Sequence, residues 1–258
     1  MPIDRDYNSR RSSEERQMLI PANLDREFLE WFKARTESSW ASRPHPHAEG
    51  WRKDTRWAKP LSEADISRVE KKWQLEFPPD YRLFLSVLHT VDRHPLARRW
   101  LTGDRSELID SVSFPDWLSD DAVIKDRLAW PLQGLMFDLK NNDLWLAAWG
   151  PKPPELKDRQ LKLAHEHSKS PRLVPVFGHR YLLAQPCQAG NPVLSIYQAD
   201  IIIYGATLRD YFLNEFHYEA GLSPDDLAKE KSSNPHLKIP LAEIPFWGPI
   251  SVEGNQPN

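Results

Sequence analysis

The sequence predicts an α+β fold in which helices flank a largely antiparallel sheet. In the first half of the chain, apolar residues recur every three or four positions, as is typical of helices that bury one face. Between residues 172 and 204, short apolar runs alternate with turn residues, as is typical of strands. The expected order is therefore helices, a hairpin, another helix and a group of strands. This order favours α+β over an alternating α/β fold.

The composition indicates one large globular domain and excludes several functional classes. With 258 residues, the chain can bury a sizeable core, and its single cysteine excludes a disulfide framework. A net charge of -3 gives no overall basic field, so we expect no nucleic-acid partner. The first residues lack the apolar core of a signal peptide, and no apolar run reaches membrane-spanning length. We therefore expect a cytoplasmic protein without a membrane partner.

The first 60 residues predict a tail followed by a helical extension. Residues 1–20 are rich in Arg, Ser and Glu without periodicity, which indicates a flexible tail. Asn23 is a good N-cap for a helix. The apolar face of that helix carries Leu24, Phe28, Trp31 and Phe32. Residues 40–60 have no clear period and predict an ordered but irregular connector.

Two further helices are expected on either side of a proline-rich turn. Ser62 is placed to cap the first helix, with Asp65 at the second position of a capping box. The turn at residues 76–80 ends this helix, and its prolines suit the first turn of the next. In that next helix the apolar residues follow helical spacing, at Tyr81, Phe84, Leu85 and Leu88.

The middle of the chain predicts a helix, a hairpin and another helix. The first helix is expected to be capped at Ser119 and to end at residues 130–134, which include a proline. Its apolar face carries Val123, Ile124 and Leu128. Strands are expected at residues 135–139 and 144–148, on either side of a polar turn. A helix is then expected over residues 155–168.

The last third predicts four strands and a final helix. The strands occupy residues 172–177, 181–184, 193–197 and 201–204. The helix that follows carries an apolar face with Leu208, Tyr211 and Phe212. Residues 219–258 are polar and proline-spaced, apart from Ile244 to Trp247, which we expect to dock back onto the domain.

Several sequence blocks carry a family resemblance. The helix that starts Leu61-Ser-Glu-Ala-Asp-Ile is followed by Phe77-Pro-Pro-Asp-Tyr-Arg-Leu-Phe-Leu. This pair of blocks resembles the opening of the Smi/Knr-type domain of the SUKH superfamily. Later blocks resemble a longer bacterial subgroup of the same superfamily: Trp149-Gly-Pro, Gly178-His-Arg-Tyr, Gly190-Asn-Pro-Val and residues 200–205.

The resemblance covers residues 61–216 and implies a single α+β domain with extensions over 1–60 and 217–258. It also implies a protein-binding role. Bacterial members are commonly immunity proteins that neutralise toxins, often nucleases, and fungal members are scaffolding regulators of cell-wall assembly. This chain departs from many members at residues 89–94, where they carry a glycine-rich turn. Superfamily membership does not fix function, so the partner stays open.

The sequence shows no catalytic or metal-binding constellation. Two histidine pairs occur, His45 with His47 and His165 with His167. Each pair supplies at most two ligands, whereas a zinc site needs three or four. Ser195 lies within a strand without a nucleophile elbow, and nothing near Cys187 in the sequence activates its thiol. No glycine-rich phosphate loop occurs either. We therefore expect no cofactor, no metal and no enzymatic activity.

Polar residues at the strand ends are interpreted as a structural framework. They are His179, Arg180, Asn191 and Asp200. We expect His179 and Arg180 to cap strand ends and to pair with Asp200 or a backbone carbonyl, because buried charges need partners. The alternative is an acid–base set of a small-molecule hydrolase, for which the sequence offers no matching nucleophile.

A binding face edged by aromatic and acidic residues is the remaining candidate. It comprises Trp149, Tyr181 and Tyr197 together with Asp116, Asp120 and Asp121. Aromatic anchors and carboxylates of this kind suit a basic protein partner. The favoured function is an immunity protein that neutralises a toxin by occlusion, and a regulatory scaffold is the alternative. The sequence leaves open the partner, the oligomeric state, and whether the aromatic residues line a groove or fill the core.

Overall fold

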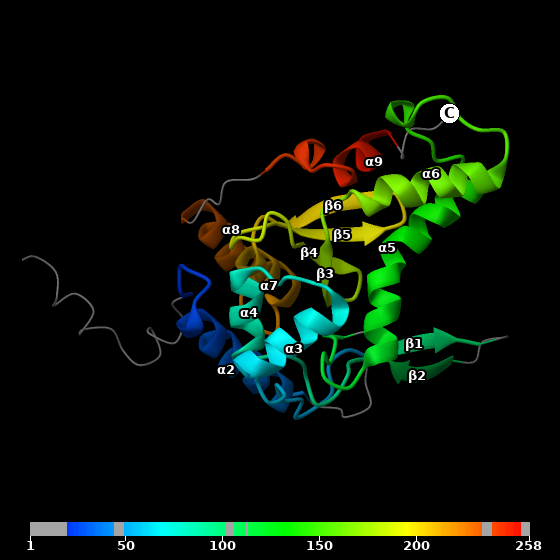
Figure 1. Cartoon of the computed structure of the whole chain (residues 1–258). Helices are drawn as coiled ribbons and strands as arrows, with labels where there is room; N and C mark the ends of the chain where they lie inside the picture. The colour runs from blue at the N-terminus through cyan, green and yellow to red at the C-terminus, as the bar shows by residue number, and fades with distance from the viewer. Residues whose placement is uncertain (1–19, 44–48, 102–105, 112, 234–238, 254–258) are drawn as a thin grey trace, which may run out of the picture.

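The computed structural model describes residues 20–43, 49–101, 106–111, 113–233 and 239–253, and a four-stranded antiparallel sheet lies between two groups of helices (Figure 1). The strands lie side by side in chain order: β3 (Leu173–Phe177), β4 (Arg180–Leu183), β5 (Val193–Tyr197) and β6 (Asp200–Gly205). The predicted α+β class is confirmed. The four predicted strands are confirmed as well, with ends that differ by one residue at most.

Both faces of this sheet are buried. Val174 and Leu182 lie opposite each other on one face and belong to a hydrophobic cluster built mainly by the first half of the chain. Tyr181 and Leu194 lie opposite each other on the other face and belong to a second cluster, built by the middle helices and the C-terminal segment. A helical layer therefore covers each face of the sheet (Figure 1).

The first cluster is rich in aromatic rings. Its helices are α2 (Arg26–Ala41), α3 (Glu63–Trp73), α4 (Pro79–Leu85) and α7 (Leu208–Phe216). The Phe32 ring lies 5.1 Å from that of Phe212 and 6.0 Å from that of Trp57. Trp40 and Trp51 stack at 4.5 Å. All three tryptophans of the irregular connector, Trp40, Trp51 and Trp57, are therefore core residues and do not line a groove.

Local capping signals set the helix starts. Asp25 caps α2 by accepting from the Phe28 amide at 2.9 Å, so the cap lies two residues after the expected position at Asn23. The predicted capping box of Ser62 and Asp65 is confirmed at the start of α3. In α4 a proline occupies the first turn, where its missing amide hydrogen costs nothing.

The proline-rich turn before α4 is tied to the sheet by the side chains that follow it. The buried Asp80 carboxylate accepts from the Tyr81 amide at 2.9 Å and from the Gly190 amide at 3.0 Å. The Tyr81 hydroxyl donates to the Pro175 carbonyl at 3.1 Å and accepts from the Trp117 indole at 3.0 Å. Two of the sequence blocks that carry the family resemblance therefore meet at one junction.

The prediction of a hairpin at residues 135–148 is wrong. A single helix, α5 (Asp121–Asn141), runs through the expected stop at Pro131, and a short 3-10 turn, η2 (Ala147–Trp149), overlaps the end of the second expected strand. Pro131 cannot donate to the carbonyl of Arg127, four residues earlier. The Tyr181 hydroxyl donates to that carbonyl at 3.0 Å instead. This tertiary hydrogen bond removes the reason for the helix to end.

Two strands were not predicted. β1 (Leu96–Trp100) and β2 (Ser106–Asp110) pair antiparallel and project from the body of the molecule (Figure 1). Their residues are half-buried or exposed, so no alternating apolar pattern marks them. The charged side chains of Arg98 and Arg99 further hide the strand character of β1.

The expectation that α7 is the final helix is also wrong. α8 (Pro224–Ser233), the short η3 (Leu241–Glu243) and α9 (Trp247–Glu253) follow it. Ile244 and Trp247 are buried in the second cluster, where α9 covers the sheet face shared with α6 (Leu156–Ser168). The helix expected over residues 155–168 is confirmed as α6.

Candidate protein-binding surface

α5 crosses the end of the sheet where two of its turns lie. The Arg127 guanidinium donates to the carbonyl of Gly178 in the β3–β4 turn. One turn of helix after Trp130, Gly134 passes so close to the β5–β6 turn that a Cβ on it would lie 3.1 Å from the Gln198 Cα. The Asp138 carboxylate then accepts from the Ala199 amide at 2.7 Å. These three contacts fix one long side of α5 to the sheet.

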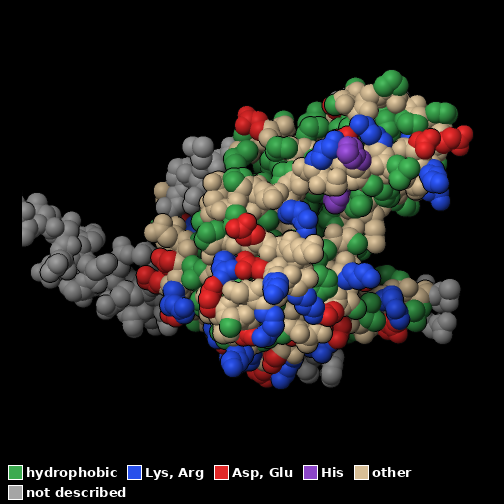
Figure 2. Space-filling view, in the orientation of Figure 1, with side chains coloured by type: hydrophobic (Ala, Val, Ile, Leu, Met, Phe, Trp, Pro, Cys, Tyr) green, Lys and Arg blue, Asp and Glu red, His purple; other side chains and the backbone are tan. Residues whose placement is uncertain are grey.

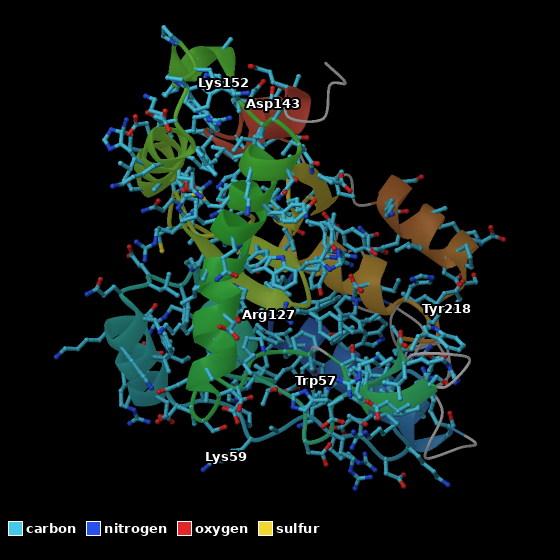
Figure 3. All side chains as sticks on the ribbon, turned by 90° about the vertical axis from the view of Figure 1, so that its right-hand side faces the viewer. Trp57, Lys59, Arg127, Asp143, Lys152 and Tyr218 are labelled. Carbon is cyan, nitrogen blue, oxygen red and sulfur yellow. The ribbon has the colours of Figure 1, made fainter. Side chains whose placement is uncertain are left out.

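Next to this contact line, α5 exposes a row of large apolar side chains. Val123, Trp130 and Phe137 recur every seven residues and are 43%, 41% and 49% exposed. Residues seven apart lie nearly above one another on a helix, so the three form one stripe. Figure 3 views this side of the molecule, with α5 running through the centre and Arg127 labelled on it.

Tyr197 extends this stripe beyond the helix. Its ring is 55% exposed at the end of β5. Trp130, Phe137 and Tyr197 line a shallow hollow of about 230 Å³, together with Gln133, Gly134 and Gln198. We call Trp130, Phe137 and Tyr197 the α5 aromatic surface. An exposed aromatic group of this kind is a typical mark of a protein-binding site.

Two carboxylates flank the α5 aromatic surface. Asp126 is exposed on α5 one turn before Trp130, and Asp200 is exposed directly across the strand pair from Tyr197. Among the described residues, neither carboxylate forms an ion pair. The guanidinium of Arg127, which follows Asp126 on the helix, donates to the Gly178 carbonyl. The rim of the hollow therefore favours a positively charged partner.

The predicted acidic residues lie at the start of α5, and two of them already have partners. Asp121 pairs with the Lys72 ammonium at 2.5 Å. Asp116 accepts from the Leu118 amide at 2.9 Å and from the Ser119 hydroxyl at 2.6 Å. Burial opposes the charge on Asp116, but these hydrogen bonds outweigh it and hold its pKa below the ordinary value. Asp120 is half-buried at the N-cap of α5, where its side chain makes no capping hydrogen bond.

The strand-end framework pairs differently from the expectation. Arg180 binds Glu215 on α7 at 3.1 Å rather than Asp200, and it donates to the Ser195 hydroxyl at 2.8 Å. Its guanidinium also lies 3.9 Å from the centre of the Tyr204 ring. The correction has a simple cause: the side chain lies along the sheet face that α7 covers, and Asp200 is exposed at the turn.

His179 belongs to the edge of the candidate surface. Its ring lies 6.3 Å from that of Tyr197 in an edge-to-face arrangement. Burial, and then the positive charges of Arg180 and Arg127, hold the pKa of His179 below its ordinary value. The imidazole is therefore neutral at physiological pH and completes the aromatic rim.

Tyr181 is buried and lies outside the α5 aromatic surface, which corrects its assignment to the binding face with Trp149 and Tyr197. Its side chain is 1% exposed, and burial raises its pKa to about 12. Its hydroxyl instead satisfies the helix carbonyl that Pro131 leaves free. Asn191 is also internal, where its amide donates to the carbonyls of Leu183 and Pro186 at 2.8 and 2.7 Å.

Trp149 lies beyond the C-terminal end of α5, away from the two sheet turns that hold that helix. It is half-buried in η2, edge-on to Trp145 with ring centres 5.4 Å apart. Of the three aromatic residues predicted for the binding face, only Tyr197 lies on the α5 aromatic surface. The sequence predicts a helix end at residues 130–134 and a strand at 135–139, and neither prediction places Trp130 and Phe137 on one exposed face. The seven-residue spacing from Val123 was the signal that could have found them.

The side chains with catalytic potential have other partners. The Ser195 hydroxyl is bonded to Arg180, not to an imidazole or a carboxylate. Burial and the nearby Glu76 raise the pKa of the Cys187 thiol, which makes it a weaker nucleophile. In the part of the chain that the structure describes, no three His, Cys, Asp or Glu side chains gather as metal ligands would. The pair His45 and His47 lies outside the described residues.

No protein-family model, curated protein or solved structure matches this chain. None of the helices in the described ranges is both long enough and apolar enough to cross a membrane.

Proposed function

We propose that this chain is a non-enzymatic protein-binding module that neutralises a toxin domain by covering its active cleft. The α5 aromatic surface makes the contact. Its partner presents an apolar anchor side chain flanked by lysine or arginine. The toxin class comes from the resemblance of the opening helices and the Phe-Pro-Pro-Asp-Tyr turn to SUKH-type immunity proteins.

The observation that carries this proposal is the grouping of three large aromatic side chains around one hollow. Trp130, Phe137 and Tyr197 come from two elements that meet only in the folded chain. Each is between 41% and 55% exposed, although the protein buries most of its other aromatic rings. Aromatic residues dominate the binding energy of protein interfaces, because they bury large areas at a small entropic cost.

The shape of this side of the molecule suits occlusion. A helix of 21 residues is about 30 Å long. The outline of the molecule is notched between the α6 region above and the β1–β2 hairpin below, and α5 runs along the floor of this notch (Figures 1 and 2). A partner seated there would contact a rigid helix that the sheet holds at three points.

The charges support a basic partner. Asp126 and Asp200 stand on either side of the aromatic rings without ion pairs of their own among the described residues. Carboxylates at the rim of an interface speed association with a basic protein and fix its orientation. Nuclease toxins carry such basic residues because they bind phosphates.

The test is a pull-down from the native host with the full chain, repeated with three variants. We expect the native chain to recover a toxin-domain protein and to abolish its activity in a purified assay. Trp130→Ala and Phe137→Ala should each weaken binding about 30-fold, the loss typical of an aromatic hot spot. Trp100→Ala is the matched control, because Trp100 is 69% exposed on β1, outside the α5 aromatic surface.

The outcomes separate the alternatives. A partner that binds Trp130→Ala and Phe137→Ala as tightly as the native chain would overturn the assigned surface. A recovered toxin that stays fully active in the complex would overturn neutralisation. Recovery of signalling or envelope-assembly proteins through the same residues would keep the surface and move the function to a regulatory scaffold.

A further inference from the structure

A second recess lies on the molecule, away from the α5 aromatic surface. It has a volume of about 330 Å³ and opens where the end of α6 meets the start of β3. We call it the α6–β3 cleft, lined by Leu75, Leu128, His167, Arg172, Leu173 and Trp247, among others. Its volume falls at the lower end of the range of small-molecule sites.

His167 lines the cleft and has no hydrogen-bond partner for its ring in the part of the chain that the structure describes. The imidazole is half-buried in the last turn of α6, edge-on to the rings of Phe246 and Trp247 at 5.6 and 5.8 Å. Figure 2 shows the histidine side chains of this region in purple over α6. A half-buried polar ring usually finds a partner, so this one is available to a ligand.

Arg172 is the second polar group of the cleft. Among the described residues, its guanidinium donates one hydrogen bond, to the Gln74 carbonyl at 3.3 Å. Four of its five N–H donors therefore remain for a ligand. Its charge acts on His167, since burial and then Arg172 hold the pKa of that imidazole below its ordinary value. Both groups line the same cleft, so one bound molecule can contact both.

The chemistry of the remaining lining defines the ligand. None of the described lining residues is acidic, and Arg172 is the one with a permanent charge. Leucine, proline and tryptophan side chains form most of the remaining wall, and the hydroxyls of Ser168, Ser170 and Tyr181, which also line it, already donate to backbone carbonyls. A cation would meet Arg172 without a counter-charge, and a purely apolar molecule would leave two polar groups without partners. An anion with an apolar body satisfies both parts.

We propose that the α6–β3 cleft binds a small monocarboxylate with an aromatic or branched aliphatic body. The Arg172 guanidinium pairs with the carboxylate, because its planar fork matches two oxygens. The His167 imidazole donates a further hydrogen bond to the carboxylate. The apolar body lies against Leu75, Leu128 and Leu173. This site does not depend on the proposed protein-binding function.

The experiment titrates the full chain with phenylacetate and with its neutral analogue phenylacetamide. Binding is read from the histidine ring signals in carbon–proton NMR and from calorimetry. We expect a saturable shift of the His167 signal at millimolar phenylacetate, assigned with a His167→Gln variant. Phenylacetamide should bind at least about tenfold more weakly, because the charge-assisted pair with Arg172 is lost.

The matched variants are Arg172→Gln and Arg99→Gln. Arg172 is exposed, so its replacement should leave the melting temperature unchanged and weaken phenylacetate about tenfold. Arg99 lies on β1, outside the cleft, and its replacement should change nothing. Equal binding of acid and amide, or an unmoved His167 signal, would overturn the proposal. Binding of a tetrapeptide that ends in phenylalanine, without binding of phenylacetate, would assign the cleft to a peptide terminus instead.

Discussion

Pro131 stands in the middle of α5 without an amide hydrogen, so the Arg127 carbonyl has no partner within the helix. Tyr181 supplies that partner from β4 at 3.0 Å. Without the hydroxyl, a part-buried carbonyl is left unsatisfied, which costs about 1–3 kcal/mol. We therefore expect Tyr181→Phe to lower the free energy of unfolding by about that amount, measured by urea denaturation.

The same argument predicts a coupling between the two residues. Pro131→Ala restores an amide that donates to the Arg127 carbonyl within the helix. In that background Tyr181→Phe should cost less, with a coupling energy of about 1 kcal/mol in a double-mutant cycle. Tyr197→Phe is the control, since that ring is 55% exposed and its loss of a hydroxyl should leave stability unchanged. Equal costs of Tyr181→Phe in both backgrounds would contradict the explanation.

His89 predicts how stability depends on pH. Its Nε2 accepts from the Trp117 amide at 3.1 Å, so the fold requires the neutral ring. Burial lowers the pKa of His89 below its ordinary 6.5, although Asp116 opposes the shift. The unfolded chain therefore binds a proton more readily than the folded one. Stability is full above about pH 6.5 and is lost as the pH falls from there towards the folded pKa.

Urea denaturation at pH 7.5 and pH 5.5 measures this effect. The native chain should be less stable at the lower pH, because protonation breaks the bond from Trp117. His89→Asn should show a shallower pH dependence, since asparagine does not titrate and tolerates the positive φ of 71° at this position. His167 and His179 also have lowered pKa values and keep part of the dependence in that variant. An equal loss of stability between pH 7.5 and pH 5.5 in the native chain and in His89→Asn would show that His89 does not cause the pH dependence.

At the scale of elements, the junction of β6 and α7 depends on a glycine. A Cβ on Gly205 would lie 2.6 Å from the Tyr211 amide nitrogen, so the strand and the helix would have to separate. We expect Gly205→Ala to destabilise the protein by about 3 kcal/mol, as overpacking does at backbone contacts. Gly178→Ala is the comparison, because Gly178 has open space around it and a φ of +55°. That variant should cost only about 1 kcal/mol of backbone strain. Equal losses of thermal stability would reject the close-packing argument.

The elements also show what the sequence could predict. The capping box of Ser62 and Asp65 spans four residues, and the strands β3 to β6 carry their own apolar patterns, so the local sequence predicts both. The continuation of α5 depends on a hydroxyl 54 residues away from Arg127, which no local pattern contains. The β1–β2 hairpin carries charged, exposed residues and gives no periodic signal.

For the same reason, only part of the α5 aromatic surface could be predicted from the sequence. Tyr197 follows a clear strand, and its place at a turn predicts exposure. Trp130 and Phe137 become surface residues only if α5 continues past Pro131, so one wrong helix end hid both. Conversely, the sequence predicts an exposed Tyr181, because no local pattern shows that α5 packs across the end of the sheet and buries this side chain.

For the whole molecule, the sheet joins two hydrophobic clusters, and this arrangement predicts a single cooperative unfolding unit. Each strand contributes side chains to both clusters, as Tyr181 and Leu182 do on β4. Loss of either cluster would expose one face of every strand. The clusters therefore stabilise each other through the shared sheet.

Trp247 tests this cooperativity. Its side chain is 1% exposed in the second cluster, and its indole donates to the Pro171 carbonyl at 3.2 Å. Trp247→Ala should cost about 3–5 kcal/mol, the usual cost of emptying a buried tryptophan site. α9 has seven residues and is too short to persist without that packing. Hydrogen exchange should show weaker protection in α4 and in α6 together, because global unfolding becomes more frequent. Trp100→Ala, at a side chain 69% exposed, should leave both unchanged. Loss of protection confined to α6 and α9 would show instead that the second cluster opens alone and that the sheet does not couple the two.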